Sequence, residues 1–214
     1  MKIFLDTIDV SSVTKHLSTG LIDGVTTTHR GIINSGRRPR DVYHELITLG
    51  VKHVSAEILG DTVYMVSEAK KLTNEFGDRL TIKLPCTRSG LDALRELKKE
   101  PVVDMDTGFF RRVNITLVFS AAQAILASKS GADFVSVPVG LCDQNSVAGL
   151  EVVRSVVELC RGTQTQVIAD CIHDVYKVTR GFYNGVDIVS MPPHIFEGMY
   201  DHVLTRQVLE DNGL

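Results

Sequence analysis

One lysine of this 214-residue chain lies within an apolar segment, where an amine can serve as a nucleophile. Lys83 stands between Ile82 and Leu84. Side chains alternate faces along a strand, so Lys83 is expected to point away from the face that its two apolar neighbours occupy. An amine that is partly shielded from water has a lowered pKa and can attack a carbonyl carbon to form an imine. The segment therefore predicts Schiff-base chemistry at Lys83.

Polar side chains with the same inward parity occur in five other short apolar segments. They are Asp6, Thr26, Thr28, Ser55, Glu57, Asn114, Thr116 and Ser136. Burying so many polar groups costs free energy unless they satisfy one another or serve a function. Asp6 and Glu57 are suited to transfer protons through a water molecule while an imine forms and a carbon–carbon bond breaks. The alternative is a buried ion-pair network around Lys83 that only stabilises the fold.

These segments belong to a regular alternation of β-branched runs and amphipathic stretches, which is typical of βαβ units. The expected strands cover residues 2–6, 24–28, 53–58, 80–85, 113–118, 134–139, 165–171 and 187–191. The expected helices cover residues 9–19, 38–49, 62–76, 88–98, 120–130, 146–160, 173–183 and 193–200. Eight such repeats predict an α/β fold consisting of a single (β/α)₈ TIM barrel, with the active site at the carboxyl ends of the strands. The alternative, a doubly wound open sheet, usually has a glycine-rich turn after its first strand, and this chain has none there.

Local signals mark the expected helix ends. Asp9, Ser89 and Ser120 each precede a periodic run and are expected to cap helices. Glycines expected just past a helix, in left-handed backbone, are Gly20, Gly50, Gly77, Gly131 and Gly185. Residues 99–112, which include Phe109 and Phe110, are too long for an ordinary connection and have no clear periodicity.

Composition restricts the kinds of partner. The net charge of −3, with interspersed charges, argues against nucleic acid or an anionic membrane surface. No apolar run approaches the roughly 18 residues of a membrane span. The four cysteines lack CxxC spacing, which favours reduced thiols and a cytoplasmic protein. Asp170, Cys171 and His173, together with His29 or Cys86, do not have the spacing of a recognised metal site, so no metal is expected.

The same segments resemble the small transaldolase and fructose-6-phosphate aldolase family nearly from end to end. The resemblance rests on residues 4–7, 21–27, 54–57, 82–87 and, most specifically, 114–124. The stretch from residue 189 to residue 205 is similar to transaldolase-like proteins carried by cyanophages. The resemblance implies a class I aldolase or transaldolase that moves a dihydroxyacetone unit of a ketose without metal or organic cofactor.

The resemblance also implies a role for each matching residue. Lys83 would form the Schiff base, and Glu57 would act as general acid and base through a water held by Thr116. Asp6 would assist proton transfer and contact donor hydroxyls. The implied substrate contacts are Ser55, Asn114 and Ser136. Thr26 and Thr28 are further candidates by their inward parity, although Thr28 stands where the family has a donor-contacting asparagine. Glu57 resembles the residue that transaldolases have at this position, whereas the fructose-6-phosphate aldolase branch usually has glutamine there.

The chain departs from the family where a substrate phosphate would bind. Leu141 and His173 stand where the family has arginines. A guanidinium binds phosphate through two hydrogen bonds, which neither residue can reproduce. Arg30 and the adjacent His29 are candidates for replacement anion binding, and His173 remains a candidate contact. The alternative is that Arg30 and His29 only cover the barrel mouth. The alternative functions are an aldolase for a non-phosphorylated or otherwise altered substrate, and a catalytically weakened homologue with a binding or assembly role.

The expected domain organisation is a barrel over residues 1–200 followed by a tail over residues 201–214. Apolar residues recur in the tail at roughly helical spacing: Val203, Leu204, Val208 and Leu209. They would expose an apolar stripe on an isolated subunit. The resemblance implies pentamers or decamers, so the tail is expected to contact a second copy in a homo-oligomer. The other expected partner is a small sugar substrate.

Overall fold

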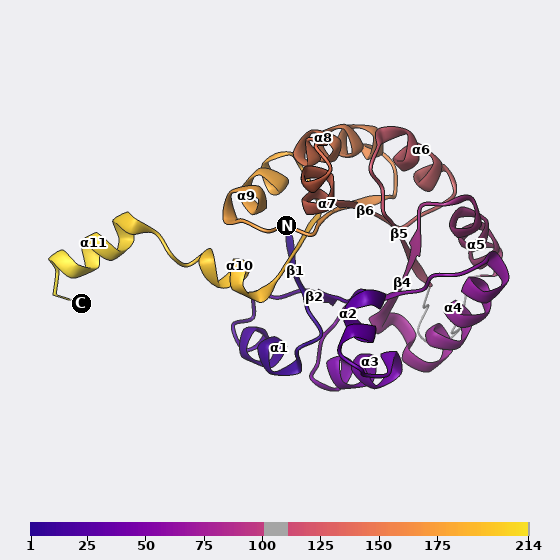
Figure 1. The fold of residues 1–214 in the computed structure, drawn as a ribbon, viewed down its shortest axis with the longest axis horizontal. Helices are drawn as coiled ribbons and strands as arrows, with labels where there is room; N and C mark the ends of the chain where they lie inside the picture. Colours follow the sequence, from indigo (N-terminus) through magenta and orange to yellow (C-terminus); the bar gives the residue numbers. More distant parts are fainter. Residues whose placement is uncertain (101–110, 214) are drawn as a thin grey trace.

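Eight parallel strands close into a barrel in sequence order in the computed structural model of the chain (Figure 1). The structure describes residues 1–100 and 111–213, so the predicted features of Phe109 and Phe110 lie outside it. The last strand pairs with the first, with Lys2 beside Ile188 and Leu5 beside Met191. This closure confirms the predicted (β/α)₈ barrel and excludes the open doubly wound sheet.

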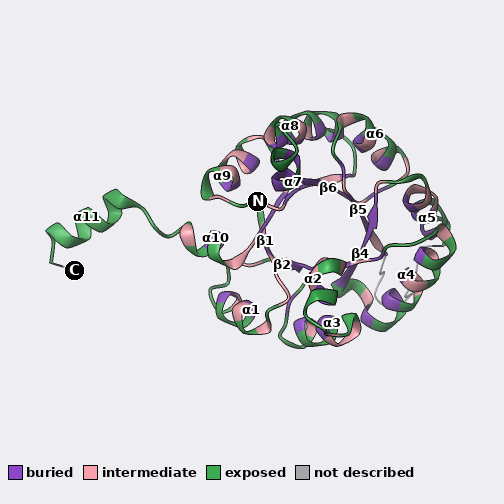
Figure 2. Cartoon of the chain, in the orientation of Figure 1, coloured by how far each residue is buried: buried purple, intermediate pink, exposed green. Residues whose placement is uncertain are grey.

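The strands and helices alternate along the chain, with extra short helices between them. The strands are β1 (Lys2–Asp6), β2 (Gly24–Thr26), β3 (Val54–Glu57), β4 (Leu80–Pro85), β5 (Arg112–Thr116), β6 (Phe134–Pro138), β7 (Gln166–Asp170) and β8 (Ile188–Met191). The helices are α1 (Val10–Leu17), α2 (His29–Asn34), α3 (Pro39–Thr48), α4 (Thr62–Phe76), η1 (Gly77–Arg79), α5 (Arg88–Lys99), α6 (Ala121–Lys129), α7 (Val139–Gln144), α8 (Gly149–Cys160), α9 (Val175–Tyr183), α10 (Pro193–Gly198) and α11 (Val203–Asp211). Most of the helices surround the barrel and bury the sides that face it (Figures 1 and 2).

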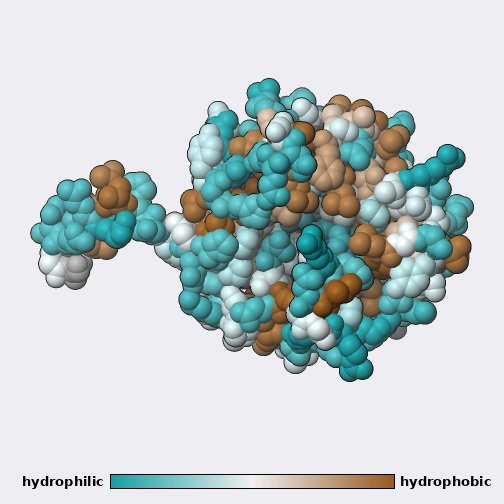
Figure 3. Space-filling view, viewed as in Figure 1, coloured by the Kyte–Doolittle hydropathy of each residue, from teal (hydrophilic) through white to brown (hydrophobic). Residues whose placement is uncertain are grey.

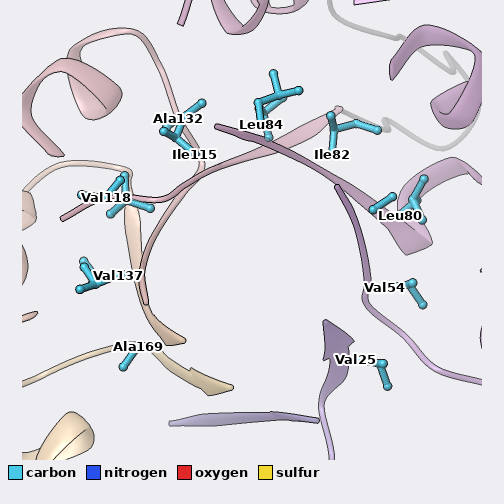
Figure 4. Close-up of a cluster of buried hydrophobic side chains, with 14 of the residues drawn as sticks. Val25, Val54, Leu80, Ile82, Leu84, Ile115, Val118, Ala132, Val137 and Ala169 are labelled. Carbon is cyan, nitrogen blue, oxygen red and sulfur yellow. The ribbon is translucent and has the colours of Figure 1, made fainter. Parts of the chain in front are cut away.

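The apolar face of each strand packs outward against the helices. Figure 4 shows such side chains on the outer side of the ring, among them Val25, Ile82 and Ile115, and all three are buried. Because side chains alternate along a strand, the polar residues between them point to the barrel axis. The outward core therefore fixes the direction of the inward polar side chains, including that of Lys83.

A separate apolar cluster fills the amino-terminal half of the barrel interior. It consists of Phe4, Phe134, Ile168 and Ile188. His53 packs against two of these rings, with centroid distances of 4.6 Å to Phe4 and 5.5 Å to Phe134. Burial, with smaller contributions from Arg112 and Lys2, lowers the pKa of His53 to about 3, so its ring is neutral in the fold. The floor of the barrel is therefore closed, and inward polar groups gather above it.

The helix-end signals are confirmed with one exception. Asp9 accepts from the Ser11 N–H, and Ser120 accepts from the Gln123 N–H. The prediction of Ser89 as a cap is wrong, because α5 begins one residue earlier and its cap, Thr87, accepts from the Gly90 N–H. All five predicted glycines have a positive φ; that of Gly50, for example, is 94°.

Two short helices at the carboxyl ends of strands are not indicated by the sequence pattern. Helix α2 follows β2 and α7 follows β6, and each has six residues. The prediction of Val139 as a strand residue is therefore wrong, because it begins α7. Six residues are too few to show a full amphipathic period, which explains why the pattern did not indicate these helices.

The chain ends in a helix that extends away from the barrel (Figure 1). All residues of α11 are exposed (Figure 2), and its apolar residues Val203, Leu204, Val208 and Leu209 are exposed with the rest. Figure 3 shows the resulting hydrophobic patch on the projecting tail. Across residues 1–100 and 111–213, no helix is both long enough and apolar enough to cross a membrane.

Candidate active site

Lys83 lies inside the barrel and is paired with a carboxylate from β7, a strand that does not neighbour β4. Its Nζ donates a hydrogen bond of 2.9 Å to Oδ2 of Asp170, the last residue of β7. The side chains of the two residues are 3% and 5% exposed. The second carboxylate oxygen of Asp170 accepts from the Cys171 N–H at 2.9 Å. Contacts at both oxygens fix the orientation of the carboxylate that faces the lysine.

The prediction that the pKa of Lys83 is lowered is wrong. Burial by itself would lower this pKa, but the charges of Asp170, Glu57 and Asp6 and the hydrogen bond to Asp170 outweigh burial and raise it. The same pairing holds the pKa of Asp170 below its ordinary value, although burial alone would raise it. Lys83 therefore rests as a buried ammonium ion with a carboxylate partner.

Asp6 is placed to exchange protons near neutral pH. It ends β1, and one of its oxygens lies within 4.8 Å of a potential ligand atom of Asp170 and of Cys171. Burial, and then the charge of Asp170, raise the pKa of Asp6 to about 7, while Lys83 acts in the opposite direction. A carboxyl group with this pKa is close to half protonated at pH 7, which suits general acid–base catalysis.

Glu57 and Thr116 lie at the ends of β3 and β5, on either side of β4. Glu57 is the register neighbour of Lys83. Its Oε2 accepts from the His29 N–H at 2.9 Å, so the start of α2 holds the carboxylate in place. Thr116 is 2% exposed and lies in register with Pro85, two residues beyond Lys83. The two residues therefore flank the strand that carries the lysine.

The other predicted substrate contacts fall into pairs and single groups. The Thr26 and Ser190 hydroxyl oxygens are 2.6 Å apart, and the Asn114 amide donates to the Ser136 hydroxyl at 2.8 Å. The Ser55 hydroxyl is buried and has no hydrogen-bond partner among the residues that the structure describes. The Thr28 hydroxyl caps α2 by accepting from the Gly31 N–H at 3.1 Å.

The positions that depart from the family lie together at the barrel mouth. His173 is exposed, and Leu141 is 36% exposed on α7. A Cβ atom added to Gly140 would lie 2.4 Å from Cδ2 of His173, so the two segments touch and only glycine fits between them. Arg30 is an exposed residue of α2, the helix whose first N–H binds Glu57.

Two residues of the site, Asp170 and Ser190, were not assigned to it from the sequence. Both have inward parity: Asp170 alternates with the outward Ala169 on β7, and Ser190 alternates with the outward Val189 on β8. The same alternation that indicated Glu57 would have indicated both, had it been applied to the last two strands. With them, every strand of the barrel contributes a polar side chain to the interior.

One group of three potential metal ligands is present among the described residues: Asp6, Asp170 and Cys171. Burial and the neighbouring carboxylates raise the pKa of the Cys171 thiol, which disfavours the thiolate that a metal binds. The Lys83 ammonium already pairs with Asp170. These residues therefore do not fit a metal centre.

The geometry defines a (β/α)₈ barrel with a lysine at the centre of its polar interior, at the end of the barrel where enzymes of this fold have their active sites. Residues 3–213 match the model of the family described as transaldolase/fructose-6-phosphate aldolase. The chain belongs to this family, and it is an enzyme of the transaldolase and aldolase type.

Curated relatives are similar over nearly the whole chain. A probable transaldolase of Dinoroseobacter shibae is 36% identical over 217 residues, which cover 100% of this chain and 93% of the relative. A probable transaldolase of Nitrosopumilus maritimus is 33% identical, with 99% of this chain and 92% of the relative covered. Among solved structures, thiamine phosphate pyrophosphorylase from Pyrococcus furiosus has a TM-score of 0.56 at 16% identity, with 89% of this chain and 85% of that chain covered, which shows the fold alone.

Proposed function

We propose that this enzyme forms a Schiff base between Lys83 and a ketose donor and transfers or releases the dihydroxyacetone unit. The observation that carries the proposal is the Lys83 side chain, which is 3% exposed inside the barrel and surrounded by carboxylates from three strands. A buried amine with acid–base groups beside it can form an imine, and the carboxylates can carry the protons of each step.

The neighbouring residues divide the remaining work in this proposal. Glu57, held by the start of α2, exchanges protons with the substrate through a water that Thr116 positions. Asp6, with a pKa of about 7, accepts and returns a proton. The donor hydroxyls contact Thr26, Ser55, Asn114 and Ser136. Thr28 is a weaker candidate than the sequence indicated, because its oxygen is engaged as a helix cap.

We also propose that the donor is bound with little help from a phosphate group. Leu141 offers no hydrogen bond, and the exposed His173 ring lies against Gly140. Arg30 is a cation on the same end of the barrel and the candidate for weak replacement binding. The enzyme is therefore expected to use non-phosphorylated ketoses nearly as well as their phosphates.

Introducing arginines at both departing positions is expected to raise kcat/KM for fructose 6-phosphate. Each charge-assisted hydrogen bond contributes about 1.5–3 kcal/mol, so the Leu141→Arg/His173→Arg variant should gain about 10-fold or more. Non-phosphorylated fructose and dihydroxyacetone are the control donors, and their kcat/KM should stay the same. If the natural enzyme already prefers the phosphate strongly and the variant gains nothing, another group binds the phosphate, and Arg30→Ala then identifies whether it is Arg30.

The projecting helix α11 is proposed to contact a second copy of the chain in a ring-like homo-oligomer. It extends away from its own barrel, and its apolar residues are exposed (Figure 1). A closed ring buries such a patch on every subunit. The proposed partners of this enzyme are therefore copies of itself and a small sugar substrate.

Removing the tail is expected to reduce the mass of the particle. A variant that ends at Tyr200 retains all eight strands and α10 but lacks α11. Light scattering should show a pentamer or decamer for the full chain and a smaller species for the truncated one. Leu204→Asp/Leu209→Asp in the full chain is the matched test of the apolar stripe, because it keeps the length of the tail, and it should also give the smaller species. A monomeric full chain, or equal masses for all three proteins, would contradict the proposal.

A further inference from the structure

The hydrogen-bond partner of Lys83 is Asp170, a carboxylate with no specific role in the division of work proposed for Glu57, Asp6 and Thr116. Asp170 reaches Nζ from β7, and the hydrogen bond joins residues 87 positions apart in the chain. Its other oxygen accepts a hydrogen bond from the backbone N–H of Cys171. Cys171 has a φ of 54°, in the left-handed region. A non-glycine residue rarely adopts this conformation, so the surrounding fold stabilises the turn that fixes the carboxylate.

The other charged groups that face Lys83 are placed differently. Asp6 faces it from β1, Glu57 from β3 and Asp170 from β7, and the Cys171 thiol lies beside them. Glu57 accepts from the His29 N–H, and the pKa of Asp6 is raised to about 7, so Asp6 is partly neutral at pH 7. Among the residues that the structure describes, Asp170 is the carboxylate that accepts a hydrogen bond from Nζ of Lys83. It is therefore the group best placed to balance the charge on the lysine nitrogen.

We propose that Asp170 is a catalytic counter-ion, which accepts the proton of Lys83 before attack and then stabilises the cationic imine. The inference rests on the proposed Schiff-base function and adds a residue to it. The overall step is R₂C=O + Lys–NH₃⁺ → R₂C=NH⁺–Lys + H₂O, in which atoms and charge balance. The nitrogen is cationic at both ends of this step, and the fixed carboxylate faces it in both states.

The order of proton transfers follows from the same balance. One proton moves from Nζ to Asp170, and the free electron pair of the amine then forms the carbon–nitrogen bond while the carbonyl electrons move to oxygen. The carbinolamine oxygen receives two protons in all, including the one held by Asp170, and leaves as water. Asp170 is again a carboxylate when the imine nitrogen is cationic, so the pair is restored without an external acid or base.

Replacing Asp170 by asparagine is expected to move imine formation to lower pH. The variant keeps the size and the acceptor oxygen of the side chain but removes its charge, and loss of a close counter-ion lowers a lysine pKa by about 1–3 units. The measurement is the rate at which dihydroxyacetone and cyanoborohydride modify Lys83, as a function of pH. The pH at the midpoint of the rise in this modification rate should be lower in Asp170→Asn by that amount. Asp174→Asn is the matched control, since asparagine also caps helices well and Asp174 pairs with Lys177 rather than with Lys83.

A second measurement separates Lys83 from Asp6, whose pKa would move in the same direction. NMR of the protein labelled at lysine Cε, with the Lys83 resonance assigned by its loss in Lys83→Met, reports the titration of the amine directly. In the natural protein this resonance should stay in its charged position through neutral pH. A neutral amine there would overturn the inference, even if Asp170→Asn does not fold.

The outcomes distinguish this inference from the function on which it rests. If the natural protein forms no adduct at Lys83, the Schiff-base function itself fails. If the adduct forms but Asp170→Asn leaves the midpoint and the Lys83 resonance unchanged, only the role of Asp170 is overturned.

Discussion

Turnover of ketose donors is expected to fall by about 10⁴-fold or more when Lys83 is replaced by methionine, because loss of a covalent nucleophile removes the whole imine pathway. Methionine has a similar length and retains the apolar contacts of the lysine stem, but it carries no amine. The measurement is kcat for dihydroxyacetone transfer with purified variant and natural enzyme. A variant whose kcat is within about 10-fold of that of the natural enzyme would show that Lys83 is not the nucleophile.

The same substitution is expected to destabilise the fold, which calls for a control. It leaves Asp170 buried without its cation, and breaking a buried ion pair in this way costs about 3–5 kcal/mol of the free energy of unfolding. The double variant Lys83→Met/Asp170→Asn removes both charges and should recover most of that stability. If the double variant unfolds like the natural protein in urea and is still inactive, the loss of turnover is chemical rather than structural.

Replacing Asp6 by asparagine is expected to lower kcat by about 10²–10⁴-fold, the usual contribution of a general acid or base. The pKa of Asp6, raised to about 7, also predicts a pH dependence. As proton acceptor, Asp6 acts when deprotonated, so kcat of the natural enzyme should rise as pH increases through about 7. This rise should be absent from the Asp6→Asn profile.

Asp9→Asn is the matched control for Asp6. Asp9 is exposed three residues further along the chain and caps α1, a role that asparagine performs as well. This variant should keep both the rate and the pH profile. An Asp6→Asn enzyme that retained the rise near pH 7 would show that a group other than Asp6 produces it.

Much of the fold could be predicted because it depends on local patterns. The alternation of Ile82, Lys83 and Leu84 indicates which face of β4 is apolar, and the structure has Ile82 and Leu84 in the outer core. Closure of the barrel follows from eight repeats of one unit. The left-handed glycines and two of the three predicted caps depend only on neighbouring residues, which explains why they are confirmed.

The remaining features depend on distances that no local pattern contains. The sequence predicts a lowered pKa for Lys83 because burial is the only effect that its own segment indicates. The charges that raise it come from β1, β3 and β7, and they meet the amine only when the barrel closes. The contact of His29 with Glu57 likewise requires α2, a helix too short to leave a periodic signal. Parity could indicate which residues point inward, but not which of them touch.

Locating the covalent adduct tests whether Lys83 is the Schiff-base residue. The enzyme is incubated with dihydroxyacetone, reduced with borohydride, digested and analysed by mass spectrometry, with Lys83→Met/Asp170→Asn as the folded control. One reduced dihydroxyacetone adduct per chain is expected, on Lys83, and none in the control. An adduct on another lysine, or an equal adduct in the control, would contradict the assignment of Lys83 as the Schiff-base residue.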